Sequence, residues 1–251
     1  MATVALAVTG AAVVVGASLP DGAEGAGDAA RAGAAQQDAV APEGKVEAAP
    51  AERAEGVGRD PLTEAETERA ESLAISNGSL RREARDVAGD RGPQHLSTNL
   101  TEIDPRLTGA AAAQRRADVV SYDYKSDSVL TKTVNLDTGK VEETRTDHGV
   151  QPPPSQDELA EAARLLMADR LGAGLREDYR DATGKKLTSM GQLQLSGMVF
   201  RKATVEKVPA GLTACGEHRC LRVIAKVRSG PWIDTRALVI DLSGRTVGRL
   251  A

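Results

Sequence analysis

The stretch VNLDTGKV, residues 134–141, sets the pattern of this chain, because it combines an alternating strand, a turn and the start of a second strand. A similar stretch, IDLSG at residues 240–244, recurs close to the C-terminus. Alternating apolar side chains place one face of a strand against a core, and glycine in the turn allows the chain to reverse. The second turn is one residue shorter when the two stretches are aligned, so we expect a repeat of structure more than of sequence.

A helix signal precedes each hairpin. Thr63-Glu64-Ala65-Glu66 and Ser155-Gln156-Asp157-Glu158 are capping boxes, in which a hydroxyl and a carboxylate accept hydrogen bonds from the unpaired amides of a helix start. Apolar residues follow both boxes at roughly helical spacing: Ala65, Ala70, Leu73 and Ala74 after the first, and Leu159, Ala162, Ala163, Leu166 and Met167 after the second. The second stripe is the clearest helix signal in the chain.

Strand candidates lie between each helix and its hairpin. In the first copy, Val120, Tyr122 and Tyr124 share one face of a strand, and the polar residues 141–146 predict an exposed edge strand. Residues 76–116 are polar and weakly patterned, which leaves a strand or a long loop open. The second copy offers strands at residues 193–205, 221–227 and 233–242. One helix laid across a curved antiparallel sheet would bury these faces in each copy, which predicts an α+β fold.

Composition divides the chain into four parts. Half of residues 21–60 are Ala or Gly and most of the others are charged, so this stretch buries too little apolar surface to offset the entropy of ordering it. We therefore expect a signal segment or anchor at residues 1–19 and a disordered linker at 20–58. Two small units would follow at residues 59–150 and 151–251.

The N-terminal run is small, apolar and uncharged from Ala2 to Leu19. This composition is typical of an export signal, and Val15-Gly16-Ala17 is a small-x-small cleavage candidate, although no Lys or Arg precedes the run. Two alternatives stay open: an uncleaved membrane anchor, since the run only just approaches bilayer thickness, and a buried helix of a soluble protein. The export signal is favoured, which places the rest of the chain at the cell surface or outside the cell.

The two cysteines of the chain, Cys215 and Cys220, flank a loop-like stretch at residues 216–219. A hairpin loop of that length brings its flanks within disulfide reach, and an exported protein can keep the bond oxidised. The alternative is a metal site in which His218 joins two thiolates, but no fourth ligand is visible and metal-binding cysteines favour a closer spacing. We therefore predict a disulfide between Cys215 and Cys220.

Several motifs resemble those of one known family. They are DPLT at residues 60–63, YDY at 122–124, NLDTGKV at 135–141 and GVQPP at 149–153. In pattern and order, residues 59–250 resemble the two small cystatin-like domains that precede the catalytic domain of bacterial copper amine oxidases. Such domains are also similar to PepSY-type modules of peptidase propeptides. The resemblance implies two cystatin-like units, each a helix packed on a curved antiparallel sheet.

The residues that carry chemistry in that family have no counterpart in this sequence. The resemblance implies a copper ion held by three histidines and a tyrosine processed to a quinone. His95, His148 and His218 lie in unrelated segments, and Tyr179 lacks the Asn-Tyr context of the modified residue. Gly-x-Ser-x-Gly and phosphate-binding glycine motifs are missing, and a net charge of −4 argues against nucleic-acid binding. We expect a chain that is not an enzyme and has no cofactor, metal or nucleic-acid partner.

Two features are candidates for contact with a partner. Asp123 and Lys125, beside Tyr122 and Tyr124, form one candidate patch, although such residues are more often core and rim. Trp232, which follows Ser229-Gly230-Pro231, is either a lid over the core or a binding anchor.

Taken together, these features predict an exported, non-catalytic module that binds an extracellular protein. Membrane contact is expected only through an uncleaved N-terminal segment. The alternative is a secreted peptidase modulator or inhibitor of cystatin or PepSY type. A role as an amine oxidase subunit has the least support.

Overall fold

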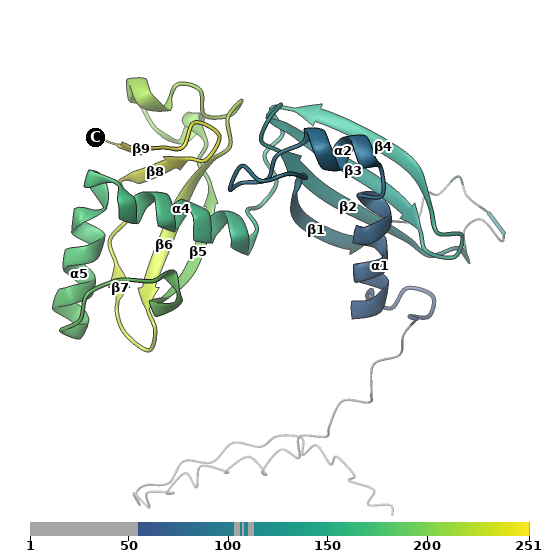
Figure 1. Cartoon of the computed structure of the whole chain (residues 1–251), viewed down its shortest axis with the longest axis horizontal. Coiled ribbons are helices and arrows are strands. Elements are labelled where there is room, and N and C mark those ends of the chain that lie inside the picture. The colour runs from purple at the N-terminus through teal and green to yellow at the C-terminus, as the bar shows by residue number, and fades with distance from the viewer. Residues whose placement is uncertain (1–54, 103–105, 107, 110–112, 251) are drawn as a thin grey trace, which may run out of the picture. The chain divides into compact units, whose positions relative to one another are not determined.

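The computed structural model describes residues 55–102, 106, 108–109 and 113–250. These residues form two antiparallel sheets with helices packed on them, which confirms the predicted α+β class (Figure 1). The predicted signal segment, and the predicted linker up to residue 54, lie outside the described residues. None of the helices within the described ranges is long and apolar enough to cross a membrane.

The first sheet is an antiparallel meander. Its strands, in spatial and sequence order, are β1 (Gln94–Leu100), β2 (Arg116–Asp123), β3 (Ser128–Asn135) and β4 (Lys140–His148). Helix α1 (Glu64–Ala74) contacts all of these strands, and the short helix α2 (Gly78–Glu83) follows it. The core between α1 and the sheet is built from small residues: Ala70, Ala74, Ala117, Val119, Val134 and Leu136.

The first core uses a different face of β2 from the predicted one. Ala117 and Val119 face α1, whereas Val120 and Tyr122 alternate with them and belong to the opposite face. Ala65 is exposed, because α1 turns its Ala70 side toward the sheet. The exposed edge strand is confirmed, since nearly every residue of β4 is exposed. The polar stretch at residues 76–116 contains both α2 and β1.

The second sheet has the order β5-β6-β8-β9, with a short strand β7 also paired to β6. The strands are β5 (Leu193–Val199), β6 (Cys220–Val227), β7 (Trp232–Ile233), β8 (Leu238–Asp241) and β9 (Thr246–Arg249). Helix α4 (Gln156–Ala168) lies across this sheet, and Leu159, Ala162, Ala163 and Leu166 from the predicted stripe are buried against it (Figure 1). Helix α5 (Ala173–Thr183) follows α4.

Three elements of the second sheet differ from the sequence predictions. The strand predicted at 193–205 ends at Val199, and the strand predicted at 233–242 is split into β7 and β8. Helix α5 was not predicted, because its buried residues are only Leu175 and Tyr179, too few for an apolar stripe. Short 3₁₀ turns fill several connections, at Arg170–Gly172, Met190–Gln192, Lys202–Thr204 and Ala210–Leu212.

Both predicted capping boxes are confirmed. The Glu66 amide donates to Thr63 Oγ1 at 3.1 Å, and the Thr63 amide donates to Glu66 Oε2 at 3.0 Å. The corresponding bonds join Ser155 and Glu158 at 3.3 and 2.9 Å. In both helices the box satisfies two amides at the helix start that would otherwise have no partner.

A buried arginine locks each capping carboxylate. Arg115 immediately precedes β2 and donates from Nε and one terminal nitrogen to both oxygens of Glu66, each at 2.8 Å. Arg219 immediately precedes β6 and donates to both oxygens of Glu158 in the same way, at 2.7 and 2.8 Å. Each arginine also donates to carbonyls of the segment before its helix, those of Gly58, Asp60 and Pro61 for Arg115, and of Pro152 and Pro153 for Arg219. The same buried pair, an arginine before a strand and the glutamate of a capping box, therefore occurs in both halves of the chain, and we call each pair a lock.

The two hairpin turns also match, and the predicted difference in their lengths is wrong. Residues 136–139 connect β3 to β4, and residues 242–245 connect β8 to β9. In each, the polar residue that ends the first strand accepts an amide three residues on: Asn135 from Thr138 at 3.0 Å, and Asp241 from Gly244 at 2.7 Å. The left-handed position that Gly139 occupies, with φ of 68°, is taken by Arg245, with φ of 52°. Because position 245 is an arginine and not a glycine, the sequence alone does not show that the two turns are equivalent.

Candidate functional site

The two tyrosines beside the candidate patch of Asp123 and Lys125 pack inward, Tyr122 fully and Tyr124 in part, while Lys125 is exposed. Tyr122 is completely buried, and its ring centroid lies 4.8 Å from that of Tyr124. The Tyr124 hydroxyl donates to Glu158 Oε1 at 2.6 Å. Burial, reinforced by the negative charge of Glu158, raises the pKa of Tyr124 well above its usual range, so the phenol stays protonated and donates. Asp123 accepts from the amides of Arg85 and Lys125, which fixes the turn after β2.

Arg219 links these tyrosines to helix α4. Its guanidinium lies 5.2 Å from the centre of the Tyr122 ring and is hydrogen bonded to Glu158, so the cluster joins β2 to the start of α4. Burial acts to lower the pKa of Arg219, but the hydrogen bonds and charge of Glu158 outweigh it and leave that pKa raised. Since these side chains satisfy one another's hydrogen bonds and charges, the arrangement stabilises the fold.

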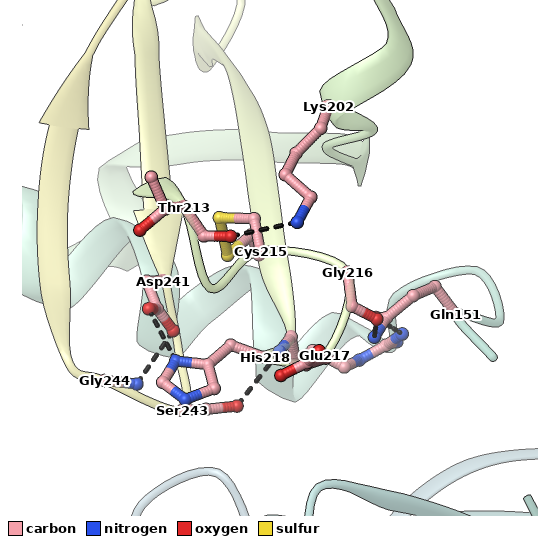
Figure 2. Close-up of a disulfide and its surroundings, with 12 residues drawn as sticks. Gln151, Lys202, Thr213, Cys215, Gly216, Glu217, His218, Asp241, Ser243 and Gly244 are labelled. Atoms are coloured by element: carbon pink, nitrogen blue, oxygen red, sulfur yellow. Dashed lines mark hydrogen bonds and ion pairs between the residues drawn. A yellow bond between two sulfur atoms is a disulfide. The ribbon is translucent and has the colours of Figure 1, made fainter. Parts of the chain in front are cut away.

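The cysteine pair lies at disulfide distance, as its spacing predicted, with Cα atoms 5.5 Å apart (Figure 2). Both residues are completely buried and pack with Phe200, Leu212 and Val239. Lys202 Nζ donates to the Thr213 carbonyl at 2.9 Å on one side of the loop, and Gln151 Nε2 donates to the Gly216 carbonyl at 3.2 Å on the other. The pair therefore closes the loop from which Arg219 emerges.

The structure does not support the alternative prediction of a metal site at this loop. His218 Nδ1 lies 2.9 Å from Oδ2 of Asp241, the last residue of β8 (Figure 2). His95 lies in β1 beside Thr98, and His148 ends β4, so the three histidines stay apart. In the part of the chain that the structure describes, no group of three or more His, Cys, Asp or Glu side chains is placed to hold a metal ion.

The His218–Asp241 contact predicts a pH-dependent contribution to stability. The Asp241 hydrogen bond, helped by the charges of Asp241, Asp127 and Glu217, raises the His218 pKa above 6.5. Its stabilisation is therefore complete below that value and is lost as the pH rises through the folded-state pKa. We expect the difference in unfolding free energy between the wild type and His218→Asn, measured by urea titration, to be largest near about pH 5.5 and to shrink toward about pH 8.5. A difference that does not change with pH would contradict this.

An exposed apolar surface lies on the outer face of the second sheet. Trp232 on β7 is 64% exposed and Met198 on β5 is 50% exposed, so the sequence alternative in which Trp232 covers the core is wrong. Register places Trp232 opposite Lys226 and Met198 opposite Arg222 on β6. Because side chains alternate along a strand, these positions share the face that is turned away from α4.

A hollow of about 430 Å³ opens beside Trp232. It lies where the segment between β7 and β8 is not paired with β6. In that segment, Thr235 Oγ1 donates to the Val223 carbonyl at 2.5 Å in place of a backbone bond between strands. Its lining combines apolar and charged residues: Met198, Arg222, Val223, Ile224, Trp232, Ile233, Asp234, Thr235 and Arg236. We call this the Trp232 hollow.

A second hollow, of about 420 Å³, adjoins the first and shares Met198 and Arg222 with it. It lies between β5 and the segment before α4, where Pro153 and Pro154 form one wall and Arg201 another. We call this the proline hollow. Met198 and Arg222 therefore stand between two neighbouring concave surfaces.

The charges around the two hollows are mostly positive. Lys226 Nζ lies 5.3 Å from the centre of the Trp232 ring. Arg222 donates to the Arg236 carbonyl, and Arg236 forms an ion pair with Asp234 at 2.8 Å that lowers the Asp234 pKa to about 2. A charged carboxylate held by an arginine is a poor general base.

Two groups of residues were missed in the sequence. No local pattern in the sequence marks Arg115 and Arg219 as buried, because their partners, Glu66 and Glu158, lie far away in the chain. The outer-face set could have been found from alternation, since Arg222, Ile224 and Lys226 occupy every second position of one strand. Only Trp232 of that surface was singled out.

Comparison with known proteins gives a partial likeness. No protein-family model matches the chain, and no curated protein matches it. Among solved structures, the chain is similar to a copper-containing benzylamine oxidase from Hansenula polymorpha, with a TM-score of 0.42 and 12% sequence identity. The match covers 77% of this chain and 30% of that one, so the chain spans less than a third of the length of the solved protein.

Proposed function

We propose that this chain is an exported, non-catalytic protein-interaction module that binds its partner through the outer face of the second sheet. The observation that carries the proposal is the exposure of Trp232 beside a hollow. A tryptophan side chain in water leaves a large apolar area uncovered, and tryptophan anchored in a pocket is among the residues that contribute most to protein–protein binding. A protein partner that covers Trp232 would remove this area from water.

The proposed architecture is a pair of cystatin-like units, related to the non-catalytic domains of copper amine oxidases. In support, each half has one capped helix across an antiparallel sheet, and the Arg115–Glu66 and Arg219–Glu158 locks are equivalent. The sequence motifs at residues 60–63 and 149–153 stand at these locks, since they include Asp60 and Pro61 in one half and Pro152 and Pro153 in the other.

Export is supported by the apolar run at residues 2–19 and by the cysteine pair. We expect protein purified from the culture fluid of its host to show no free thiol until it is reduced. Reduction should then lower the free energy of unfolding by roughly 2 kcal/mol, because opening a short closed loop releases entropy in the unfolded chain. Thiol titration and urea unfolding measure the two effects. Two free thiols in the native secreted protein would contradict both the disulfide and the export argument.

The interaction itself is tested by capturing partners from the host's extracellular fraction with the full chain as bait. Trp232→Ala is compared with Val141→Ala, which truncates another exposed apolar side chain, on β4. We expect wild type and Val141→Ala to capture one dominant partner, and Trp232→Ala to capture at least about tenfold less. Loss of an anchor typically costs about 2 kcal/mol or more, which is roughly thirtyfold in affinity.

The outcomes of that experiment separate the candidate functions. A captured peptidase whose activity falls on binding would make the module a peptidase modulator. No dominant partner, or equal capture by Trp232→Ala and wild type, would contradict binding through this surface.

A further inference from the structure

Most of the positive side chains around the two hollows lack an acidic partner of their own. Arg201 and Arg222 form no ion pair with any carboxylate of the described residues, and Lys226 faces the Trp232 ring. Asp234 is the one acidic residue that lines either hollow, and Arg236 already binds it. This surface is therefore positive although the chain as a whole carries a net charge of −4.

A positive surface of this kind favours a negatively charged occupant. Complementary charges steer association and disfavour partners of the wrong charge. Arginine in particular can hold a carboxylate with two hydrogen bonds. Charge complementarity at Arg201 and Arg222 therefore points to carboxylate groups on the partner.

The shape of the surface favours an extended occupant. The Trp232 hollow and the proline hollow are neighbours, and Met198 and Arg222 line both. An extended segment can lay successive side chains into two adjoining hollows, as peptides do on surfaces with a separate pocket for each anchor. The exposed faces of Met198 and Trp232 call for an apolar side chain in that segment.

We infer that the partner presents an extended acidic segment. One apolar side chain of this segment lies in the Trp232 hollow, and its carboxylates bind Arg222 and Arg201. The inference rests on the proposed interaction function and specifies the chemistry of the partner at the same surface.

An unbiased probe tests this chemistry. A phage-displayed library of random peptides is selected on the immobilised full chain and counterselected on Trp232→Ala. We expect the enriched peptides to be acidic around one aromatic or aliphatic residue. Enrichment of neutral or basic peptides, or failure to enrich any peptide that depends on Trp232, would overturn the inference. Tighter binding of single-stranded DNA or of anionic lipid vesicles than of the enriched peptides would overturn it too.

Matched charge reversals give the second test. Arg201→Glu with Arg222→Glu is compared with Lys185→Glu and Lys186→Glu, which make the same charge change at exposed residues that line neither hollow. By fluorescence anisotropy, the arginine double variant should bind the enriched peptide at least about tenfold more weakly, and the lysine variant within about twofold of wild type. The wild-type affinity should also fall with added salt. Equal loss in both double variants would mean that net charge, and not this surface, governs binding.

The inference and the proposed function can fail separately. If the partner captured from the extracellular fraction depends on Trp232 but binds the arginine double variant as it binds wild type, the interaction function stands and the acidic segment is wrong. If capture is independent of Trp232, the proposed binding surface itself is wrong.

Discussion

Replacing Arg219 with alanine is expected to lower the free energy of unfolding by about 3–5 kcal/mol, the largest effect that we predict for a single residue. Arg219 and Glu158 are both 0% exposed, so the substitution leaves the buried Glu158 carboxylate without the charge of Arg219 and away from water. It also removes the donors to the Pro152 and Pro153 carbonyls and the cation over the Tyr122 ring. Urea unfolding of the full chain at neutral pH measures the loss.

Two further variants separate the buried charge from simple loss of packing. Arg219→Met combined with Glu158→Leu replaces the pair by apolar side chains. Part of the stability should return, because the uncompensated charge is gone, while the Ser155 amide and the Tyr124 hydroxyl lose their acceptor. Arg164→Ala is the matched control on α4, since Arg164 pairs with Glu161 but its side chain is 59% exposed. That control should cost less than about 1 kcal/mol. If Arg219→Ala costs no more than the control, the buried lock is not a main source of stability.

Arg115→Ala is expected to lower the free energy of unfolding by about 3 kcal/mol, for the same reason and in the first half of the chain. Arg115 and Glu66 are nearly buried, with side chains 9% and 6% exposed, and the arginine also holds the Gly58 and Asp60 carbonyls. Arg145→Ala is the control, because Arg145 pairs with Asp147 on the exposed strand β4.

The cost of Arg115→Ala should depend on pH. Burial acts to raise the Glu66 pKa, but hydrogen bonds from Arg115 and from the Thr63 amide outweigh it, and the pKa is lowered from 4.5. Glu66 therefore contributes stability above that value, and the contribution is lost as the pH falls through the folded-state pKa. The difference between wild type and Arg115→Ala should narrow in acid. A difference that widens as the pH falls would contradict the ion pair as its cause.

These substitutions and the Trp232 variants should act on different properties. Trp232 lies on the outer face, outside the core, so its truncation should change binding with little loss of stability. Arg219 also holds the Pro153 carbonyl, and Pro153 lines the proline hollow. Loss of Arg219 is therefore expected to disturb the shape of one wall of that hollow as well as the fold.

Local signals in the sequence predicted much of the fold correctly. The capping boxes and the apolar stripe of α4 involve residues within a few positions of one another, because helix formation depends on neighbours three and four residues apart. The distance between Cys215 and Cys220 follows from the short loop that connects them. The predictions failed where distant contacts decide, as in the face that β2 turns to α1 and the split of the predicted strand at 233–242.

The class of fold, the starts of α1 and α4, the positions of the two hairpin turns and the distance between the two cysteines all depend on the order of nearby residues, so they could be predicted from the sequence alone. The burial of Tyr122 and the exposure of Trp232, by contrast, could be seen only in the folded chain, although both are aromatic residues in strands. The physical reason is that burial depends on what packs against a face from elsewhere in the chain. For Tyr122 that partner is Arg219, far along the sequence, whereas Trp232 stays 64% exposed with Lys226 over its ring.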